Sequence, residues 1–202
     1  MDMWVALTAH DPRPAVCELF SGCMELTSQA VTGGLGAMKP YDLVLGDDLL
    51  NRDTQNQVLS RLDLEDPALV AVGFPCDPWS PITNLQDYFT VLEKRRDGEK
   101  LLAFTSRVVR NCLKRGRHVL LENPLASQAW THPRFQWMRA DKRFVWFRTD
   151  LCAHGLQDPA GQPLLKPTRN VTTSIAIASA AALRCPGPEE HPSHGEILGQ
   201  PA

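Results

Sequence analysis

The sequence lacks the features that mark several large classes of protein. Its formal net charge is -2, which excludes a globally basic nucleic-acid binder and leaves only a local patch for such contacts. No apolar run approaches a membrane span, and Met1-Asp2-Met3-Trp4 does not resemble the start of a signal peptide. The six cysteines form no Cys-x-x-Cys pair, which argues against a secreted disulfide scaffold. We therefore expect an intracellular protein of a reducing compartment, cytoplasm or nucleus, without a membrane partner.

The 202 residues are enough for one core of a sheet and helices. Apolar runs predict strands at 15–20, 42–45, 70–72, 118–121, 144–147 and 171–178. Between them, helical periodicity predicts helices at 24–31, 55–62, 101–115 and 135–138. This alternation indicates an α/β fold with a mostly parallel sheet and helices on both faces. We expect a single domain over 1–202, irregular termini at 1–14 and 186–202, and a partly mobile loop within 80–100.

One stretch organises the functional interpretation: the apolar run that ends at Gly73-Phe74-Pro75-Cys76. Gly and Pro bound this run, so it reads as a buried strand with Cys76 just past its carboxyl end. Ligands bind at that edge of open α/β sheets. Prolines on either side of Cys76 restrict the backbone, as a positioned nucleophile requires. The alternative is an inert, buried thiol beside a turn.

A small-residue turn follows the first expected strand, in Glu18-Leu19-Phe20-Ser21-Gly22-Cys23. Gly22 permits close approach of a ligand to the backbone, and the amides of the following helix favour electron-rich groups. The spacing matches neither glycine-rich phosphate-binding pattern, so a cofactor without a pyrophosphate is favoured. Asp47 and Asp48 are candidates to accept hydrogen bonds from an adenine amino group or a ribose hydroxyl. The alternative for Asp48 is a helix cap.

Glu122 follows another expected buried strand at the same sheet edge. Partial desolvation there would raise the pKa of its carboxyl group and let it donate a proton. A thiolate and a protonated carboxyl group together suit nucleophilic addition to an electron-poor ring. The alternative for Glu122 is a salt bridge at the strand end.

Three motifs together resemble the cytosine-C5 DNA methyltransferases, whose members carry Asp-Leu-Phe-Ser-Gly, Gly-Phe/Pro-Pro-Cys and Glu-Asn-Val in this order. Here they read Glu18-Leu19-Phe20-Ser21-Gly22, Gly73-Phe74-Pro75-Cys76 and Glu122-Asn123-Pro124, and Trp79-Ser80 after the cysteine also matches. The resemblance covers about residues 16–178. Glu18 and Pro124 depart mildly from the family pattern, and no target-recognition domain is evident. The chain thus resembles a minimal or divergent member, of the kind found within mobile-element polyproteins.

The resemblance implies a Rossmann-like class I methyltransferase fold that binds S-adenosylmethionine. It places the cofactor beside Glu18, Phe20, Ser21, Gly22, Phe74 and Pro75, with Asp47 or Asp48 at its adenine end. It implies that Cys76 adds to C6 of cytosine and that Glu122 contacts N3 and the exocyclic amine. Arg169 is the candidate for a base-oxygen or phosphate contact, and the other substrate-binding residues are Trp79, Ser80, Asn123 and Pro124.

The partner implied is nucleic acid, with DNA favoured over RNA, and a partner protein or larger polyprotein would supply target recognition. Two alternatives remain open: methylation of a free pyrimidine nucleotide, and a catalytically silent module that binds nucleic acid or cofactor. Separately, Cys185, His191 and His194 lie close together in the sequence, and Cys152 or His154 could join them. Their spacing matches no strong zinc signature, so the sequence predicts no metal and leaves a mixed Cys/His zinc site as the alternative.

Overall fold

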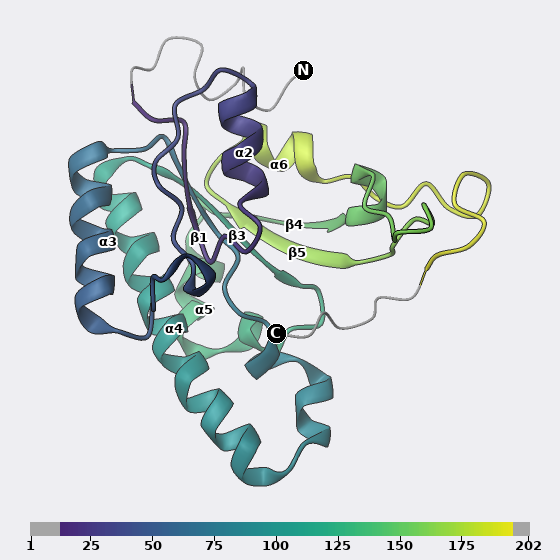
Figure 1. Cartoon of the computed structure of the whole chain (residues 1–202), viewed down its shortest axis with the longest axis horizontal. Helices are drawn as coiled ribbons and strands as arrows, with labels where there is room; N and C mark the ends of the chain where they lie inside the picture. The colour runs from purple at the N-terminus through teal and green to yellow at the C-terminus, as the bar shows by residue number, and fades with distance from the viewer. Residues whose placement is uncertain (1–12, 196–202) are drawn as a thin grey trace.

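A five-stranded mixed sheet organises the computed structural model, which describes residues 13–195 (Figure 1). The spatial order of the strands is β1-β2-β3-β5-β4. Strands β1, β2 and β3 are parallel, whereas β5 runs antiparallel to both β3 and β4. The α/β class is therefore confirmed, but the sheet is mixed, because two of its four strand pairings are parallel and two are antiparallel. Strand β5 is the reversed strand. The strands are β1 (Val16–Leu19), β2 (Leu69–Val72), β3 (His118–Pro124), β4 (Val145–Asp150) and β5 (Pro167–Thr172).

Helices cover both faces of this sheet, as expected (Figure 1). Side chains alternate across β3, so Leu120 faces the small core under α2 and α6, while Leu121 joins the large core under α3, α4 and α5. The larger core is rich in aromatic side chains. The helices are α2 (Glu25–Thr32), α3 (Arg52–Glu65), α4 (Tyr88–Arg115), α5 (Pro133–Ala140) and α6 (Ile175–Ala181). Five short 3₁₀ helices are η1 (Leu43–Leu45), η2 (Asp77–Trp79), η3 (Pro81–Leu85), η4 (Gln128–Thr131) and η5 (Leu151–His154).

The two chain connections that follow β1 lead to opposite sides of this strand. After β1 and α2, residues 37–41 run alongside the outer edge of β1, with parallel bridges from Val16 to Ala37 and from Leu19 to Tyr41. The chain then crosses through α3 to β2 on the other side of β1. The carboxyl ends of β1 and β2 thus form a topological switch point, which is where open α/β sheets bind ligands.

Two expected strands are wrong in whole or in part. In the predicted strand 42–45, residues 43–45 form η1 because the Asp42 carboxylate caps it by accepting a hydrogen bond from the Val44 amide. Their apolar side chains face solvent, with Val44 76% exposed. Of 171–178, only the first part is strand: Ser174 accepts a hydrogen bond from the Ile177 amide and starts α6.

The expected partial loop within 80–100 is wrong from residue 88 onward. Ser80 caps η3, and Asp87 caps α4 by accepting a hydrogen bond from the Thr90 amide. Helix α4 therefore runs for 28 residues and begins well before residue 101. Residues 186–195 contain no helix or strand, whereas residues 1–12 and 196–202 lie outside the described part. Among residues 13–195, no helix has both the length and the apolar character to cross a membrane.

Candidate active site

The turn between β1 and α2 is held in an uncommon backbone conformation. Phe20, Gly22 and Met24 all have positive φ, at 55°, 51° and 59°. The Phe20 amide donates to the Tyr41 carbonyl oxygen at 2.8 Å, and the Gly22 amide donates to Asp42 Oδ2 at 2.9 Å. A Cβ atom at Gly22 would meet nothing within 4 Å, so the backbone here borders open space. Such strained, over-determined turns are typical of ligand-binding sites.

Two polar atoms near this turn are buried without a hydrogen-bond partner among the described residues: Ser21 Oγ and Asp47 Oδ2. The other Asp47 oxygen accepts from Lys39 Nζ at 2.9 Å. Buried polar atoms are usually hydrogen-bonded, so both atoms are suited to bind polar groups of a ligand. In contrast, Glu18 is engaged within the fold, because its Oε2 accepts from both the amide and the hydroxyl of Thr27 at 2.9 and 2.8 Å. Asp48 accepts from the Leu50 amide at 2.8 Å and so closes a turn. It is not the helix cap expected as its alternative, because Asn51 caps α3.

Cys76 lies past the end of β2 and is exposed. The Phe74 side chain, in contrast, points into the core. Its ring is buried against those of Trp130 and Phe135, with ring centroids 5.5 and 5.4 Å away. Pro75 between them is half-buried. The sequence Gly73-Phe74-Pro75-Cys76 therefore anchors one side chain in the core and presents the thiol at the sheet edge.

The structure brings Cys76 and Glu122 into the same electrostatic neighbourhood at that edge. The Glu122 carboxyl group lies beside Gly73, in the loop that carries Cys76, because a Cβ atom at Gly73 would be 3.8 Å from Glu122 Oε2, an ordinary contact distance. Burial raises the pKa of the Glu122 carboxyl group, and its Oε1 is buried without a hydrogen-bond partner among residues 13–195. Desolvation by the surrounding protein raises the pKa of the Cys76 thiol, and the negative charge of the nearby Glu122 raises it further. Burial therefore favours the protonated form of Glu122, which is the form that a proton donor requires.

Lys166 is a neighbour of both groups that local sequence patterns did not reveal. Its charge lowers the pKa of the Cys76 thiol and of the Glu122 carboxyl group, partly opposing the effect of burial. A hydrogen bond with Thr168 also lowers the pKa of Glu122. Both residues reach this edge because β5 pairs antiparallel with β3, with Thr168 opposite Pro124. Only the strand register could have indicated them.

The other predicted substrate-binding residues support the loop that carries Cys76. Asn123 Nδ2 donates to the Phe74 carbonyl oxygen at 2.5 Å, while its Oδ1 is buried without a partner among the described residues. The Pro124 carbonyl oxygen accepts from Trp130 Nε1 at 3.0 Å. Trp79 is buried and packs edge-on against the His132 ring, and Ser80 caps η3. The side chains of Trp79 and Ser80 thus have structural partners.

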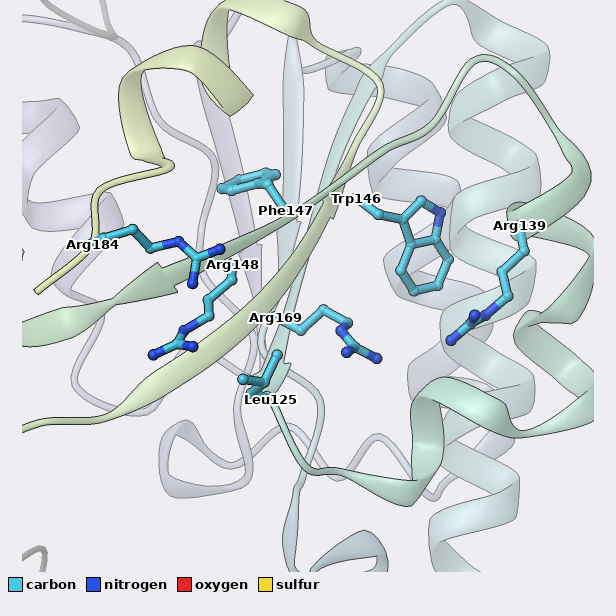
Figure 2. Close-up of a pocket in the computed structure, with 7 residues that line it drawn as sticks. All are labelled: Leu125, Arg139, Trp146, Phe147, Arg148, Arg169 and Arg184. Carbon is cyan, nitrogen blue, oxygen red and sulfur yellow. The ribbon is translucent and has the colours of Figure 1, made fainter.

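Arg169 is not brought together with Cys76 and Glu122. It pairs in register with Asn123, so it lies on the face of the sheet opposite to Glu122. There it lines a cavity of about 640 Å³ (Figure 2). Burial and the charge of Arg139 lower the pKa of the Arg169 guanidinium, which marks a cationic pocket suited to an anion. The lining residues are Leu125, Arg139, Trp146, Phe147, Arg148, Arg169 and Arg184.

Gly98 on α4 lets the helix approach the loop after Cys76. A Cβ atom at Gly98 would lie 2.7 Å from Pro78 Cβ and 3.1 Å from Trp79 Cζ2. Gly98→Ala should therefore displace η2, cost about 1–3 kcal/mol of the free energy of unfolding, and lower the reactivity of Cys76. Thermal unfolding and thiol alkylation measure the two effects. Glu93→Ala, at an exposed position of the same helix, is the control. If Gly98→Ala instead raises the Tm, as at an unhindered helical glycine, the close contact is refuted.

Comparison with known proteins adds no family: no family model matches the chain, and no curated protein matches it. The class of this protein is therefore defined by its fold and by the geometry of its site alone. It is an α/β protein with an exposed thiol beside the switch point of its sheet, after β2, and a partly buried carboxyl group on the neighbouring strand β3.

Proposed function

We propose that this protein is an S-adenosylmethionine-dependent methyltransferase that acts on C5 of cytosine in nucleic acid, with DNA favoured over RNA. The observation that carries the proposal is the pairing of exposed Cys76 with Glu122, whose carboxyl pKa is raised and whose Oε1 has no partner among the described residues. We further infer a Rossmann-like class I methyltransferase core. The switch point at β1 and β2 supports that inference.

The chemistry follows from what each group does. Lys166 favours the thiolate of Cys76, whose Sγ forms a bond to C6 of the base. The C5–C6 electron pair shifts toward N3, where protonated Glu122 stabilises it by donating a proton. The resulting enamine is nucleophilic at C5 and takes the methyl group. Loss of the C5 proton to a solvent base then re-forms the C5–C6 double bond and expels the sulfur of Cys76 as a thiolate. N3 returns its proton to the Glu122 carboxylate, which restores both groups.

The residues at the β1 turn fit the cofactor. S-adenosylmethionine, when bound, supplies the electrophilic methyl group. Its ribose hydroxyls and adenine amine need acceptors, and the unpaired Ser21 Oγ and Asp47 Oδ2 are buried acceptors beside this turn. The open space at Gly22 allows the backbone to approach the ligand closely.

Local positive charge supports a phosphate-bearing substrate despite the net charge of -2. Four arginines line the cavity around Arg169. The guanidinium of one of them, Arg139, lies 4.9 Å from the Trp146 ring centroid. A second cavity of about 450 Å³ lies between α3 and α4 and is lined by Glu99 and by Arg52, Arg96, Lys100, Arg107 and Arg134. Such clusters suit contacts to a phosphate backbone.

Covalent trapping tests the proposal. The full chain is incubated with S-adenosylmethionine and substrates that contain 5-fluorocytosine, because fluorine at C5 cannot leave as a proton. We expect a denaturation-resistant adduct on DNA that requires the cofactor, and Cys23→Ser should trap equally well. Parallel reactions with RNA and with the free nucleotide separate the alternatives. If no substrate traps although calorimetry detects cofactor binding, the silent binding module replaces this proposal.

A further inference from the structure

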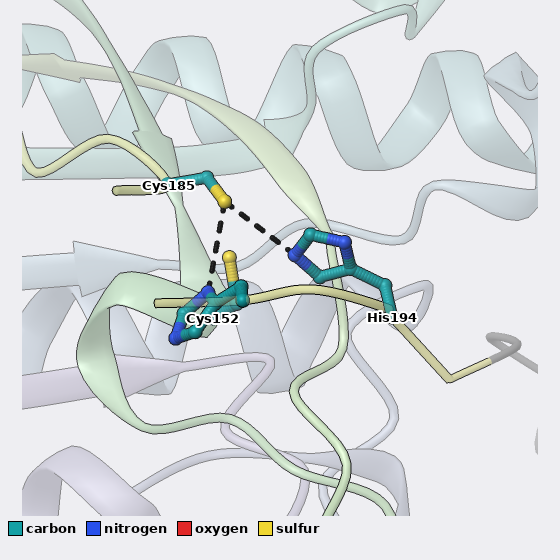
Figure 3. Close-up of side chains that lie close together, drawn as sticks. Cys152, Cys185 and His194 are labelled. Carbon is teal, nitrogen blue, oxygen red and sulfur yellow. Dashed lines mark hydrogen bonds between the residues drawn. The ribbon is translucent and has the colours of Figure 1, made fainter. Parts of the chain in front are cut away.

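Four metal-ligating side chains meet at the far end of the sheet from α3, at the connection after β4. They are Cys152, Cys185, His191 and His194, and their ligand atoms all lie within 4.8 Å of one another. Figure 3 shows Cys152, Cys185 and His194 of this cluster. Cys152 is buried in η5, whereas the other three belong to the chain after α6. Segments more than thirty residues apart in the sequence thus contribute to one cluster.

The distances from Cys185 to the two histidines match the edges of a tetrahedral zinc site. Zinc bonds to sulfur at about 2.3 Å and to histidine nitrogen at about 2.0 Å, so tetrahedral geometry separates sulfur and nitrogen ligands by roughly 3.6 Å. Here Cys185 Sγ lies 3.6 Å from His191 Nδ1 and 3.4 Å from His194 Nε2. The two imidazoles are perpendicular, with centroids 5.6 Å apart, so their nitrogens approach the sulfur from different directions.

The surrounding backbone fixes the ligands in place. Asp150, buried at the end of β4, accepts from the Cys185 amide at 3.1 Å through Oδ2. The His191 amide donates to the Gly187 carbonyl oxygen at 2.8 Å, which closes a tight turn between the ligands. Residues 186–195 contain no helix or strand and contribute nothing to the two hydrophobic core clusters. A segment with so little apolar burial needs a cross-link to hold one conformation.

We propose that this cluster binds one structural Zn²⁺ ion, with two thiolates and two neutral imidazoles as its four ligands. This donor set is soft and mixed, as zinc prefers, and four protein ligands leave no open position for catalysis. The metal ties the chain after α6 to the turn after β4. Arg184 precedes Cys185 and lines the cavity around Arg169. The same metal therefore also holds Arg184 in place at that cavity. The site is independent of methyl transfer.

Metal analysis of the purified full chain tests this proposal. The protein is reduced, offered Zn²⁺, and passed over a weak chelating resin. We expect about one zinc ion per chain to remain. Replacement of zinc by Co²⁺ should produce the intense visible bands of tetrahedral cobalt together with thiolate charge transfer. Cys185→Ser and His194→Ala should each lose the zinc, whereas Cys23→Ser, which changes an exposed thiol on α2's entry turn, should keep it.

A thermal readout guards against variants that fail to fold. A strong chelator should lower the Tm of the wild type and leave the Tm of Cys185→Ser unchanged, because only the wild type gains stability from the metal. Substoichiometric zinc in the reduced wild type would overturn the proposal. Wild-type zinc content in Cys185→Ser would do the same, as would a Cys152–Cys185 disulfide in protein isolated without an oxidant.

Discussion

Cys76→Ala should abolish the covalent adduct and lower methyl transfer by at least about 10³-fold. The reason is that the proposed bond to C6 needs the Cys76 thiol, and removal of a nucleophile costs rates of this order. Radiolabelled methyl transfer and adduct formation on 5-fluorocytosine DNA measure the two effects. Because Cys76 is exposed, the Tm should stay close to that of the wild type.

Two further variants serve as comparisons for Cys76→Ala. Cys23→Ala removes another exposed thiol and should retain full activity. Lys166→Met keeps the nucleophile but removes the cation that lowers the thiol pKa, so the thiolate should form at higher pH. Adduct formation by folded Cys76→Ala would eliminate Cys76 as the nucleophile and, with it, the proposed mechanism.

Glu122→Gln should lower methyl transfer by about 10²–10⁴-fold, the usual contribution of a positioned general acid. The amide keeps the shape of the carboxyl group and can still donate a hydrogen bond, but it cannot transfer a proton to N3. Single-turnover rates with saturating cofactor measure the change in the chemical step. A variant with the wild-type rate would leave Glu122 with only a structural role.

The same substitution should stabilise the fold at neutral pH. Burial raises the pKa of folded Glu122 above its ordinary value of 4.5. The unfolded chain therefore loses this proton first as the pH rises, and the wild type loses stability until the pH passes the pKa of the folded state. Glutamine has no proton to lose. We expect a higher Tm for Glu122→Gln at about pH 8, a difference that shrinks toward about pH 4. Glu93→Gln, at an exposed carboxyl group, should show neither effect.

Elements with a strong local signal could be predicted from the sequence. The apolar run of β2 is bounded by Gly and Pro, and all four of its residues are buried. The positions of Cys76 and Glu122 at neighbouring strand ends follow from such runs. The structure places Glu122 within β3 rather than after it, which brings its carboxyl group beside Gly73.

The failures share a cause, which is that capping side chains outweighed local composition. Asp42 turned an apolar run into η1, and Ser174 turned a β-branched run into α6. Asp87 started α4 inside a polar stretch that has no strong periodicity. Lys166, Gly98 and the position of Arg169 depend on contacts between distant segments, for which a single sequence carries no local signal.

Because β5 runs in the reverse direction, the reacting groups and the nearby cation are held by different parts of the fold. Cys76 and Glu122 sit where strands leave the sheet, so the core fixes both. Lys166 sits where the chain enters β5, at the end of the connection that begins at η5. Insertions or deletions at about residues 156–165 can move this cation without repacking the nucleophile or the acid. The reactivity of the thiol is therefore adjustable through a surface loop, while the sheet that aligns the reacting groups stays unchanged.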